Sequence, residues 1–320
     1  LLPVGRVLTA GFPSTTVASL ASLGTGRPPG EHGLVGYQVA LPGGHRLVNH
    51  LRWDAELDPR VWQPLPTVFE GAAAAGVTVT RVGPAAFAGS GLTEAALRGG
   101  GYARADALGE RVADTFAALD HRAGGRDDPP ALVYVYWADL DATGHRRGVG
   151  SPAWCTELEH VDALAARLAA GLPSDGALWV TADHGMVDVA EADRVDVDAA
   201  EEAALREGVA LLGGEPRARH VYVRPGAAPD VLAAWRERLA GRAWVASRDE
   251  AVGEGWFGPR VSDWVRPRIG DVVVAVYDGA VVACRREPRE SALVAHHGSL
   301  TPEELLVPLL GYVPSEGSTG

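Results

Sequence analysis

The sequence predicts an α/β protein, namely a three-layer α/β/α sandwich with a mostly parallel, doubly wound sheet and a small α+β insertion. Residues 131–137 (ALVYVYW) form a nearly continuous apolar run, which is typical of a central parallel strand covered on both faces. A helical stretch follows, and then a second apolar run at 177–181. Strand, helix and strand therefore occur within about 50 residues, and the right-handed crossover of such a βαβ unit implies a doubly wound sheet.

The first elements are expected to be a strand, a tight turn and a helix. Residues 5–10 are short and apolar, residues 11–16 (GFPSTT) form the turn, and residues 17–23 are compatible with a helix. Gly-Thr-Gly at 24–26 ends that helix. Thr16 is therefore expected at a helix N-terminus.

The α/β rhythm continues up to the second apolar run. A helix is expected at 65–75 and an alternating strand at 77–82. Thr-Glu-Leu-Glu at 156–159 has the spacing of a capping box, which predicts a helix that ends near Ala170.

The α+β insertion is expected at residues 188–259, which leaves 1–187 and 260–315 as the core. The insertion begins acidic and Ala-rich and contains short apolar stretches near Val221, Trp235 and Trp244. After it, two apolar stretches flank Asp278-Gly279, a dipeptide that favours a type I′ hairpin turn. The last predicted helix begins at Thr301-Pro302-Glu303-Glu304, with threonine as N-cap and proline at the first helical position.

Composition narrows the classes of function. The 320 residues are 47% hydrophobic, which suffices for a large buried core, and the net charge of -12 argues against a surface that coats nucleic acid. Small anionic substrates remain compatible, because a bound metal inverts the local potential. Two cysteines are too few for a disulfide framework, and no apolar run is long enough for a transmembrane helix. The sequence starts at Leu1 without methionine, so a targeting segment is not visible; the sequence predicts neither a location nor an oligomeric state.

Four clusters of polar residues carry the chemistry. They are Phe-Pro-Ser-Thr-Thr at 12–16, Asp-Ala-Thr-Gly-His at 141–145, Asp-His-Gly-Met at 183–186 and His-Gly at 297–298. The last three each follow an apolar, strand-like run, which in an open α/β sheet places them at the carboxyl edge, where ligands bind. Aspartate and histidine are ligands that a catalytic zinc favours. Each motif alone is weak, whereas the set in this order is far more specific.

In this order the motifs resemble the nucleotide pyrophosphatase/phosphodiesterase branch of the alkaline phosphatase superfamily. The resemblance extends from about residue 11 to about residue 310, and it implies an alkaline phosphatase-like fold and two divalent metal ions, expected to be Zn²⁺. In that family the threonine is the nucleophile and shares one metal with the Asp-His of Asp-His-Gly-Met. Carried over, this implies that Thr16, Asp183 and His184 hold the first zinc.

The resemblance also implies a second zinc, held by Asp141, His145 and His297. Asp141 is preferred to Asp139 because only Asp141 stands four positions before His145. His297 is preferred to His296 because the family ligand directly precedes glycine.

Two features depart from the family pattern. Family members carry a further aspartate on an earlier strand, in an Asp-Gly pair before the nucleophile, and the given sequence begins after that position. We expect that the segment with this aspartate has been lost. The alternative is that the first metal has one ligand fewer than in the family. The other departure is Ser19, at a position where the diesterase branch commonly has an asparagine that contacts the phosphate. Ser19 is therefore a candidate substrate-binding residue.

The resemblance implies hydrolysis of a small phosphodiester or nucleotide pyrophosphate through a covalent threonyl intermediate. A threonine hydroxyl is a poor nucleophile unless a base or a metal activates it. The two zinc ions would activate this hydroxyl. A phosphomonoesterase or phosphonate hydrolase of the same superfamily is the alternative, since it would use the same metals. A catalytically inactive binding protein on this scaffold is the third hypothesis, suggested by the missing aspartate.

Overall fold

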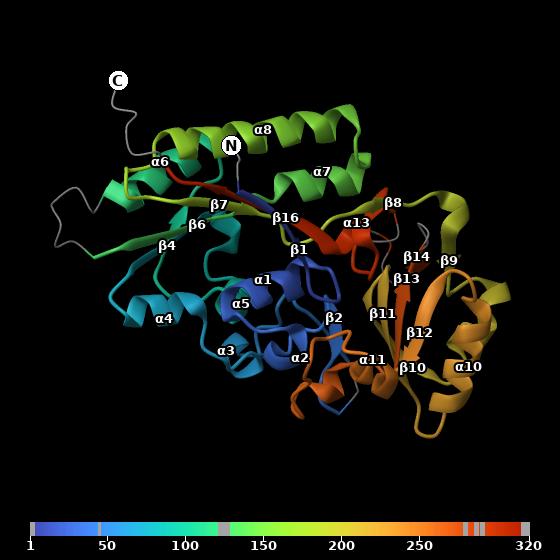
Figure 1. The fold of residues 1–320 in the computed structure, drawn as a ribbon. Coiled ribbons are helices and arrows are strands. Elements are labelled where there is room, and N and C mark those ends of the chain that lie inside the picture. Colours follow the sequence, from blue (N-terminus) through green and yellow to red (C-terminus); the bar gives the residue numbers. More distant parts are fainter. Residues whose placement is uncertain are drawn as a thin grey trace.

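The computed structural model describes residues 4–43, 46–120, 129–277, 281–284, 288 and 292–314. Its middle layer consists of two three-stranded sheets, with the strand orders β1-β16-β7 and β5-β4-β6 (Figure 1). Their bounds are Val4–Thr9 (β1), Leu306–Tyr312 (β16), Leu178–Thr181 (β7), Gly101–Arg104 (β5), Thr78–Gly83 (β4) and Ala131–Val135 (β6). β4 pairs in parallel with β5 and β6, whereas β16 runs antiparallel to both β1 and β7, so that β1 and β7 point the same way.

Helices cover both faces of this middle layer, as Figure 1 shows. α6 (Leu108–Asp120), α7 (Asp139–Arg147) and α8 (Pro152–Ala170) lie on one face, and α1 (Thr16–Thr25), α4 (Val68–Ala74) and α5 (Gly91–Ala96) lie on the other. The predicted α/β/α architecture is confirmed. No helix among the described residues is both long and apolar enough to cross a membrane.

Shorter elements connect these layers. They are α2 (Pro29–His32), α3 (Pro59–Trp62), η1 (Ala85–Phe87), α13 (Pro302–Leu305) and three two-stranded pairings: β2 (Gln38–Ala40) with β3 (Leu47–Asn49), β8 (Val187–Asp188) with β15 (Ala295–His296), and β9 (Arg194–Asp196) with β14 (Val281–Ala283). The predicted helix start at Thr301 is confirmed, since Thr301 is the N-cap of α13. The helix makes a single turn before β16 begins.

A second sheet lies beside the sandwich. It has the antiparallel order β10-β11-β13-β12 and is accompanied by η2 (Glu191–Asp193), η3 (Ala200–Glu202), α9 (Ala203–Arg206), α10 (Ala228–Arg238), α11 (Arg248–Gly253) and η4 (Arg266–Arg268). The strands are Val209–Glu215 (β10), Ala218–Val223 (β11), Val272–Val276 (β13) and Ala243–Ser247 (β12). Trp235 and Leu239 pack with Val272, Val274 and Val276 of β13 in a second hydrophobic core. Three of these strands lie within residues 188–259, and β13 joins them from beyond residue 260; the division into a core and an insertion stays a prediction.

The apolar run at 131–137 differs from the expectation in its burial. It forms the parallel strand β6, but β6 has a sheet neighbour on one side only within the described part of the chain. Leu132 is 36% exposed, and Trp179 on β7, the last strand of the other sheet, is 56% exposed. The prediction of a central strand is therefore wrong for the described residues, because β6 stands at the end of its sheet and leaves one edge without a partner strand.

Two local predictions are corrected. α8 begins at Pro152, one turn before the predicted capping box, because Ser151 caps it by accepting a hydrogen bond from the Trp154 N–H at 3.3 Å. The strands that flank Asp278-Gly279 do not form a hairpin, because β13 pairs with β11 and β12 whereas β14 pairs with β9. The dipeptide itself lies outside the described residues.

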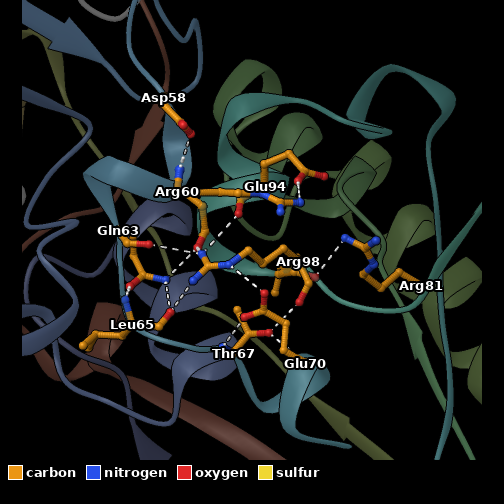
Figure 2. Close-up of polar contacts among 11 residues, drawn as sticks. Asp58, Arg60, Gln63, Leu65, Thr67, Glu70, Arg81, Glu94 and Arg98 are labelled. Carbon is orange, nitrogen blue, oxygen red and sulfur yellow. Dashed lines mark hydrogen bonds and ion pairs between the residues drawn. The ribbon is translucent and has the colours of Figure 1, made fainter. Parts of the chain in front are cut away.

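Arg98, a buried arginine, connects α3, α4 and α5 through hydrogen bonds (Figure 2). The Arg98 guanidinium donates to the carbonyls of Gln63 and Ala95 at 3.2 and 3.0 Å and to the Glu70 carboxylate at 3.1 Å. It thereby joins the end of α3, the start of α4 and the end of α5. α5 in turn contacts α1 closely, since a Cβ at Gly24 would lie 1.8 Å from the Ala96 carbonyl oxygen. The position of α1 thus depends on a glycine that permits this close approach.

Three histidines are buried in the neutral state. Burial lowers the pKa of His32 to about 3 and the pKa values of His50 and His220 to about 4. In His220, Nδ1 accepts a hydrogen bond from the Gly270 N–H at 3.0 Å and Nε2 donates to the Val35 carbonyl at 2.8 Å. The neutral ring therefore satisfies both partners, whereas a proton on Nδ1 would face another donor.

We expect the free energy of unfolding to decrease as the pH falls from about 6.5 to about 4. Across this range the unfolded histidines take up protons while the folded ones stay neutral, so the unfolded state binds more protons and is favoured at the acidic end. A pKa shift of one unit corresponds to about 1.4 kcal/mol, so the lowered pKa of His220 contributes about 3 kcal/mol to this decrease in the free energy of unfolding. Melting temperatures measured in the presence of a chelator test this without a contribution from bound metal. A His220→Gln variant with an undiminished pH dependence would contradict it.

Candidate active site

The four motifs converge at one end of the sandwich. Thr16 is the first residue of α1, whose N-cap is Thr15. Asp141 and His145 stand one turn apart on α7, which follows β6, and Asp183-His184 follows β7. All three predicted positions, at a helix N-terminus and after two apolar strands, agree with the sequence analysis.

A short strand pairing brings the fourth motif to the other three. β15 pairs with β8 through Ala295 and His296, so that His297 emerges beside the turn that contains His184. The rings of His184 and His297 stack, with centroids 3.6 Å apart and an angle of 20° between their planes. The ring of His145 lies 5.0 Å from that of His297. The structure therefore brings all three histidines together.

The polar atoms of the site lie within a few ångströms of one another. Thr16 Oγ1 is 3.2 Å from His184 Nε2, which is 3.6 Å from Asp183 Oδ2. Asp141 Oδ1 is 3.5 Å from His145 Nε2 and 3.7 Å from His297 Nε2. One ligand atom from each of Asp141, His184 and His297 also lies within 4.8 Å of the other two. All six residues expected to bind metal thus lie in one cluster.

The backbone fixes the orientation of each of these imidazoles. Nδ1 of His145, His184 and His297 donates to the carbonyls of Ala295, Gly185 and Ser14, at 2.7, 2.8 and 2.9 Å. When the rings are neutral, Nε2 of each carries a lone pair. These lone pairs face the carboxylates of Asp141 and Asp183, which also have only lone pairs to offer when ionised. Two sets of acceptors facing each other in this way repel, unless a cation or a proton lies between them.

Burial makes a proton on the His297 ring unfavourable, and it also makes an ionised Asp141 costly unless a cation lies nearby. Burial, followed by the neighbouring His184 and His145, lowers the pKa of His297 well below its usual value, so that its ring stays neutral. Burial also raises the pKa of Asp141, an effect that His145 and His184 oppose. The Oδ1 atom of Asp141 is buried without a hydrogen-bond partner in the described structure. The donor set of aspartate oxygens and imidazole lone pairs therefore fits divalent cations, zinc in particular.

Asp139 and His296, the alternatives to Asp141 and His297 as metal ligands, do not point into the cluster. The Asp139 side chain is 56% exposed, and its Oδ2 lies 3.9 Å from Arg111 Nη1. His296 is buried and directs Nε2 to the Leu293 carbonyl at 3.1 Å. Neither side chain faces the cluster, which agrees with the preference for Asp141 and His297.

Ser19 lies one turn after Thr16 on α1. Its side chain is buried, and its hydroxyl has no hydrogen-bond partner in the described structure. Residues three apart on a helix share a face, so Ser19 lies on the face of α1 that bears Thr16.

Tyr136 lies in the site although it belongs to none of the four motifs. Its pKa is raised well above the usual value by burial and then by the charge of Asp183, while the nearby Thr16 side chain has a smaller, opposite effect. Tyr136 is therefore a neutral hydrogen-bonding group next to the candidate nucleophile. Its position directly after β6, at the carboxyl end of a parallel strand, is the signal that could have identified it.

Comparisons with known proteins agree with this geometry. The sequence profile of the family described as type I phosphodiesterase / nucleotide pyrophosphatase matches residues 4–300. A search of curated proteins found no match.

Among solved structures, the chain is similar to murine ectonucleotide pyrophosphatase/phosphodiesterase 5, with a TM-score of 0.71 and 19% identity over 96% of this chain and 79% of that one. A second murine structure of that protein is described as an inactive variant, with alanine in place of a threonine, in complex with AMP; its TM-score is 0.69 and its identity 17%, over 95% of this chain and 78% of that one. Phosphonoacetate hydrolase from Sinorhizobium meliloti, in complex with phosphonoformate, gives a TM-score of 0.69 and 21% identity over 98% and 82% of the two chains. At these identities the likenesses show a shared fold.

Proposed function

We propose that this chain, which belongs to the type I phosphodiesterase / nucleotide pyrophosphatase family, is a two-zinc hydrolase that cleaves phosphodiester or pyrophosphate bonds of small molecules with Thr16 as nucleophile. The observation that carries the proposal is the arrangement of three imidazoles, each with Nδ1 bound to a backbone carbonyl and with Nε2 facing a carboxylate. Metal-ligating histidines almost always use their second nitrogen in this way. The proposal extends the family assignment to the metal and the nucleophile of this chain.

We assign the six clustered residues to two metal ions. Thr16, Asp183 and His184 would hold one, and Asp141, His145 and His297 would hold the other. Two zinc ions supply Lewis acidity for the phosphoryl oxygens and lower the pKa values of the hydroxyl and of water. The short distance between the His184 and His297 rings supports two adjacent sites rather than two separate ones.

The residues of the chain would provide the nucleophile and hold the phosphoryl group. Thr16 Oγ1 attacks phosphorus and forms a covalent threonyl intermediate as the bond to the leaving oxygen breaks, and water then hydrolyses that intermediate. The first-turn N–H groups of α1 favour the negative phosphoryl oxygens beside Thr16. Ser19 and Tyr136 are placed to hydrogen-bond that group or the nucleophile.

A phosphonate hydrolase or phosphomonoesterase is the second candidate. The chain is similar to phosphonoacetate hydrolase at the same TM-score as to the AMP complex, and this similarity supports the second candidate. Both reactions use the same nucleophile and metals, so substrate shape distinguishes them. The complex of the murine neighbour with AMP supports a nucleotide as the substrate of this chain.

Initial rates on matched aryl substrates separate the two candidates. We expect kcat/KM for an aryl phosphodiester to exceed that for the corresponding aryl phosphomonoester and for phosphonoacetate by at least about tenfold, or 1.4 kcal/mol in transition-state binding. A diesterase pocket accommodates the second ester group, whereas a monoesterase site must bind an extra negative charge. A preference for the monoester or the phosphonate would favour the second candidate.

A further inference from the structure

A fully buried ion pair lies behind the two histidine turns of the site. Arg217 Nε and Nη2 donate to Oε1 and Oε2 of Glu304, each at 2.8 Å, and both side chains are 0% exposed. The Ser299 N–H donates to Oε1 at 2.9 Å, and the Thr301 hydroxyl donates to Oε2 at 2.7 Å. Each carboxylate oxygen of Glu304 thus accepts two hydrogen bonds, which gives this group one fixed orientation.

Glu304 contacts both turns that contribute histidines. Its carboxylate holds Ser299, two residues after His297, and its backbone carbonyl accepts a hydrogen bond from Gly185, the residue after His184, at 2.8 Å. The two backbone segments approach closely here, since a Cβ at Gly185 would lie 1.9 Å from the carbonyl oxygen of the preceding residue, Glu303. One residue therefore positions the backbone on both sides of the stacked His184 and His297 rings.

The contacts continue from the His297 turn to the loop of the nucleophile. Ser14 Oγ donates to the Ser299 carbonyl at 2.8 Å and accepts from the Gly298 N–H at 3.1 Å. The Ser14 N–H donates to the Gly298 carbonyl at 3.0 Å, and the Ser14 carbonyl accepts from His297 Nδ1 at 2.9 Å. The loop before Thr16 and the His297 turn thus hold each other, and Ser299 connects them to Glu304.

We propose that Glu304 and Arg217 are positioning residues that hold both histidine turns in the geometry that binds metal; this inference rests on the proposed function. A buried ion pair is weak grounds for a net gain in stability, because desolvation opposes the attraction of the charges. Fixing one geometry is a different effect, and metal affinity depends strongly on groups that orient the ligands. Arg217 lies between β10 and β11, so the pair also connects the second sheet to the site.

A matched pair of variants tests the proposal. Glu304→Gln keeps the size of the side chain and removes the charge that binds Arg217. Glu70→Gln makes the same change in the pair with Arg98, which joins α4 to α5 away from the four motifs (Figure 2). Zinc affinity is measured by competition with a chromogenic chelator, and the geometry of the site is followed through the visible absorption bands of the Co²⁺-substituted protein.

We expect Glu304→Gln to bind zinc at least about tenfold more weakly than wild type and to alter the Co²⁺ spectrum. Glu70→Gln should lower the melting temperature while both metal readouts stay at wild-type values. Arg217→Lys keeps the positive charge but loses the two-pronged contact, and it should fall between wild type and Glu304→Gln. A merely structural role would lower melting temperatures without this order in zinc affinity.

Thr301→Val covers the case in which Glu304→Gln does not fold. It leaves the ion pair intact and removes one hydrogen bond to Oε2, so we expect a smaller weakening of zinc binding in the same direction. Folded Glu304→Gln or Thr301→Val protein that matches wild type in zinc affinity and Co²⁺ spectrum overturns the positioning proposal and leaves the proposed function standing. Wild-type protein that binds no zinc overturns both.

Discussion

Thr16→Ala is expected to lower kcat for an aryl phosphodiester by at least about a thousandfold, because it removes the oxygen that forms the covalent intermediate. Thr16 Oγ1 is 3.2 Å from His184 Nε2, a proposed ligand of the metal that would activate the hydroxyl. Stopped-flow and steady-state rates with the aryl substrate measure this loss. Thr16→Ser retains a hydroxyl and should keep part of the activity.

Thr15→Ala is the matched control for the nucleophile. Thr15 accepts a weak hydrogen bond from the Ala18 N–H at 3.5 Å as the N-cap of α1, and its loss should cost on the order of 1 kcal/mol in stability. The variant should nevertheless retain turnover at temperatures where it is folded. Near-normal activity of Thr16→Ala, or an equal loss in Thr15→Ala, would refute the assignment of the nucleophile.

Removing the metal ions is expected to reduce hydrolysis to the background rate, and adding zinc should restore it. With no cation present, the Nε2 lone pairs of His145 and His297 face Asp141 Oδ1 at 3.5 and 3.7 Å, which is an unfavourable arrangement. Metal-free protein should therefore also melt at a lower temperature, since zinc binds the folded state. Elemental analysis should find about two zinc ions in each active chain.

Two aspartates on α7 supply a control within the same helix. Asp141→Asn removes a proposed ligand charge and should lose zinc and activity together, whereas Asp139→Asn changes an exposed side chain near Arg111 and should affect neither. Full activity after exhaustive dialysis against a chelator would refute the metal proposal. Equal zinc content in the two variants would refute the role of Asp141.

Local elements could be predicted where a few neighbouring residues decide the structure. Thr16 begins α1 because a helix-compatible run follows it and Thr15 caps it, and Gly26 ends the helix in the left-handed conformation. The capping box at Thr156 predicts the start of α8 one turn late, because two capping signals lie close together there and Ser151 is the one used. A choice between such signals depends on which neighbours the helix packs against.

Pairing between strands could not be predicted in the same way. The Asp278-Gly279 dipeptide indicates a hairpin, but the flanking strands β13 and β14 find partners elsewhere, in β11, β12 and β9. The apolar run of β6 indicates full burial, yet β6 has only one neighbour among the described strands. In both cases the preference of a short segment yields to contacts with distant segments.

From the sequence alone one can predict the residue types of the site and their order along strands that end at one edge. That much follows from local patterns, since apolar strands, a capped helix start and Asp and His clusters are each encoded within a few residues. Tertiary packing, by contrast, sets which imidazole nitrogen faces the carboxylates, brings Tyr136 close to Thr16, and places Glu304, paired with Arg217, against both histidine turns. These contacts join residues as far apart as Ser14 and Ser299, and they form because burial leaves each polar group to find its partner wherever packing brings one.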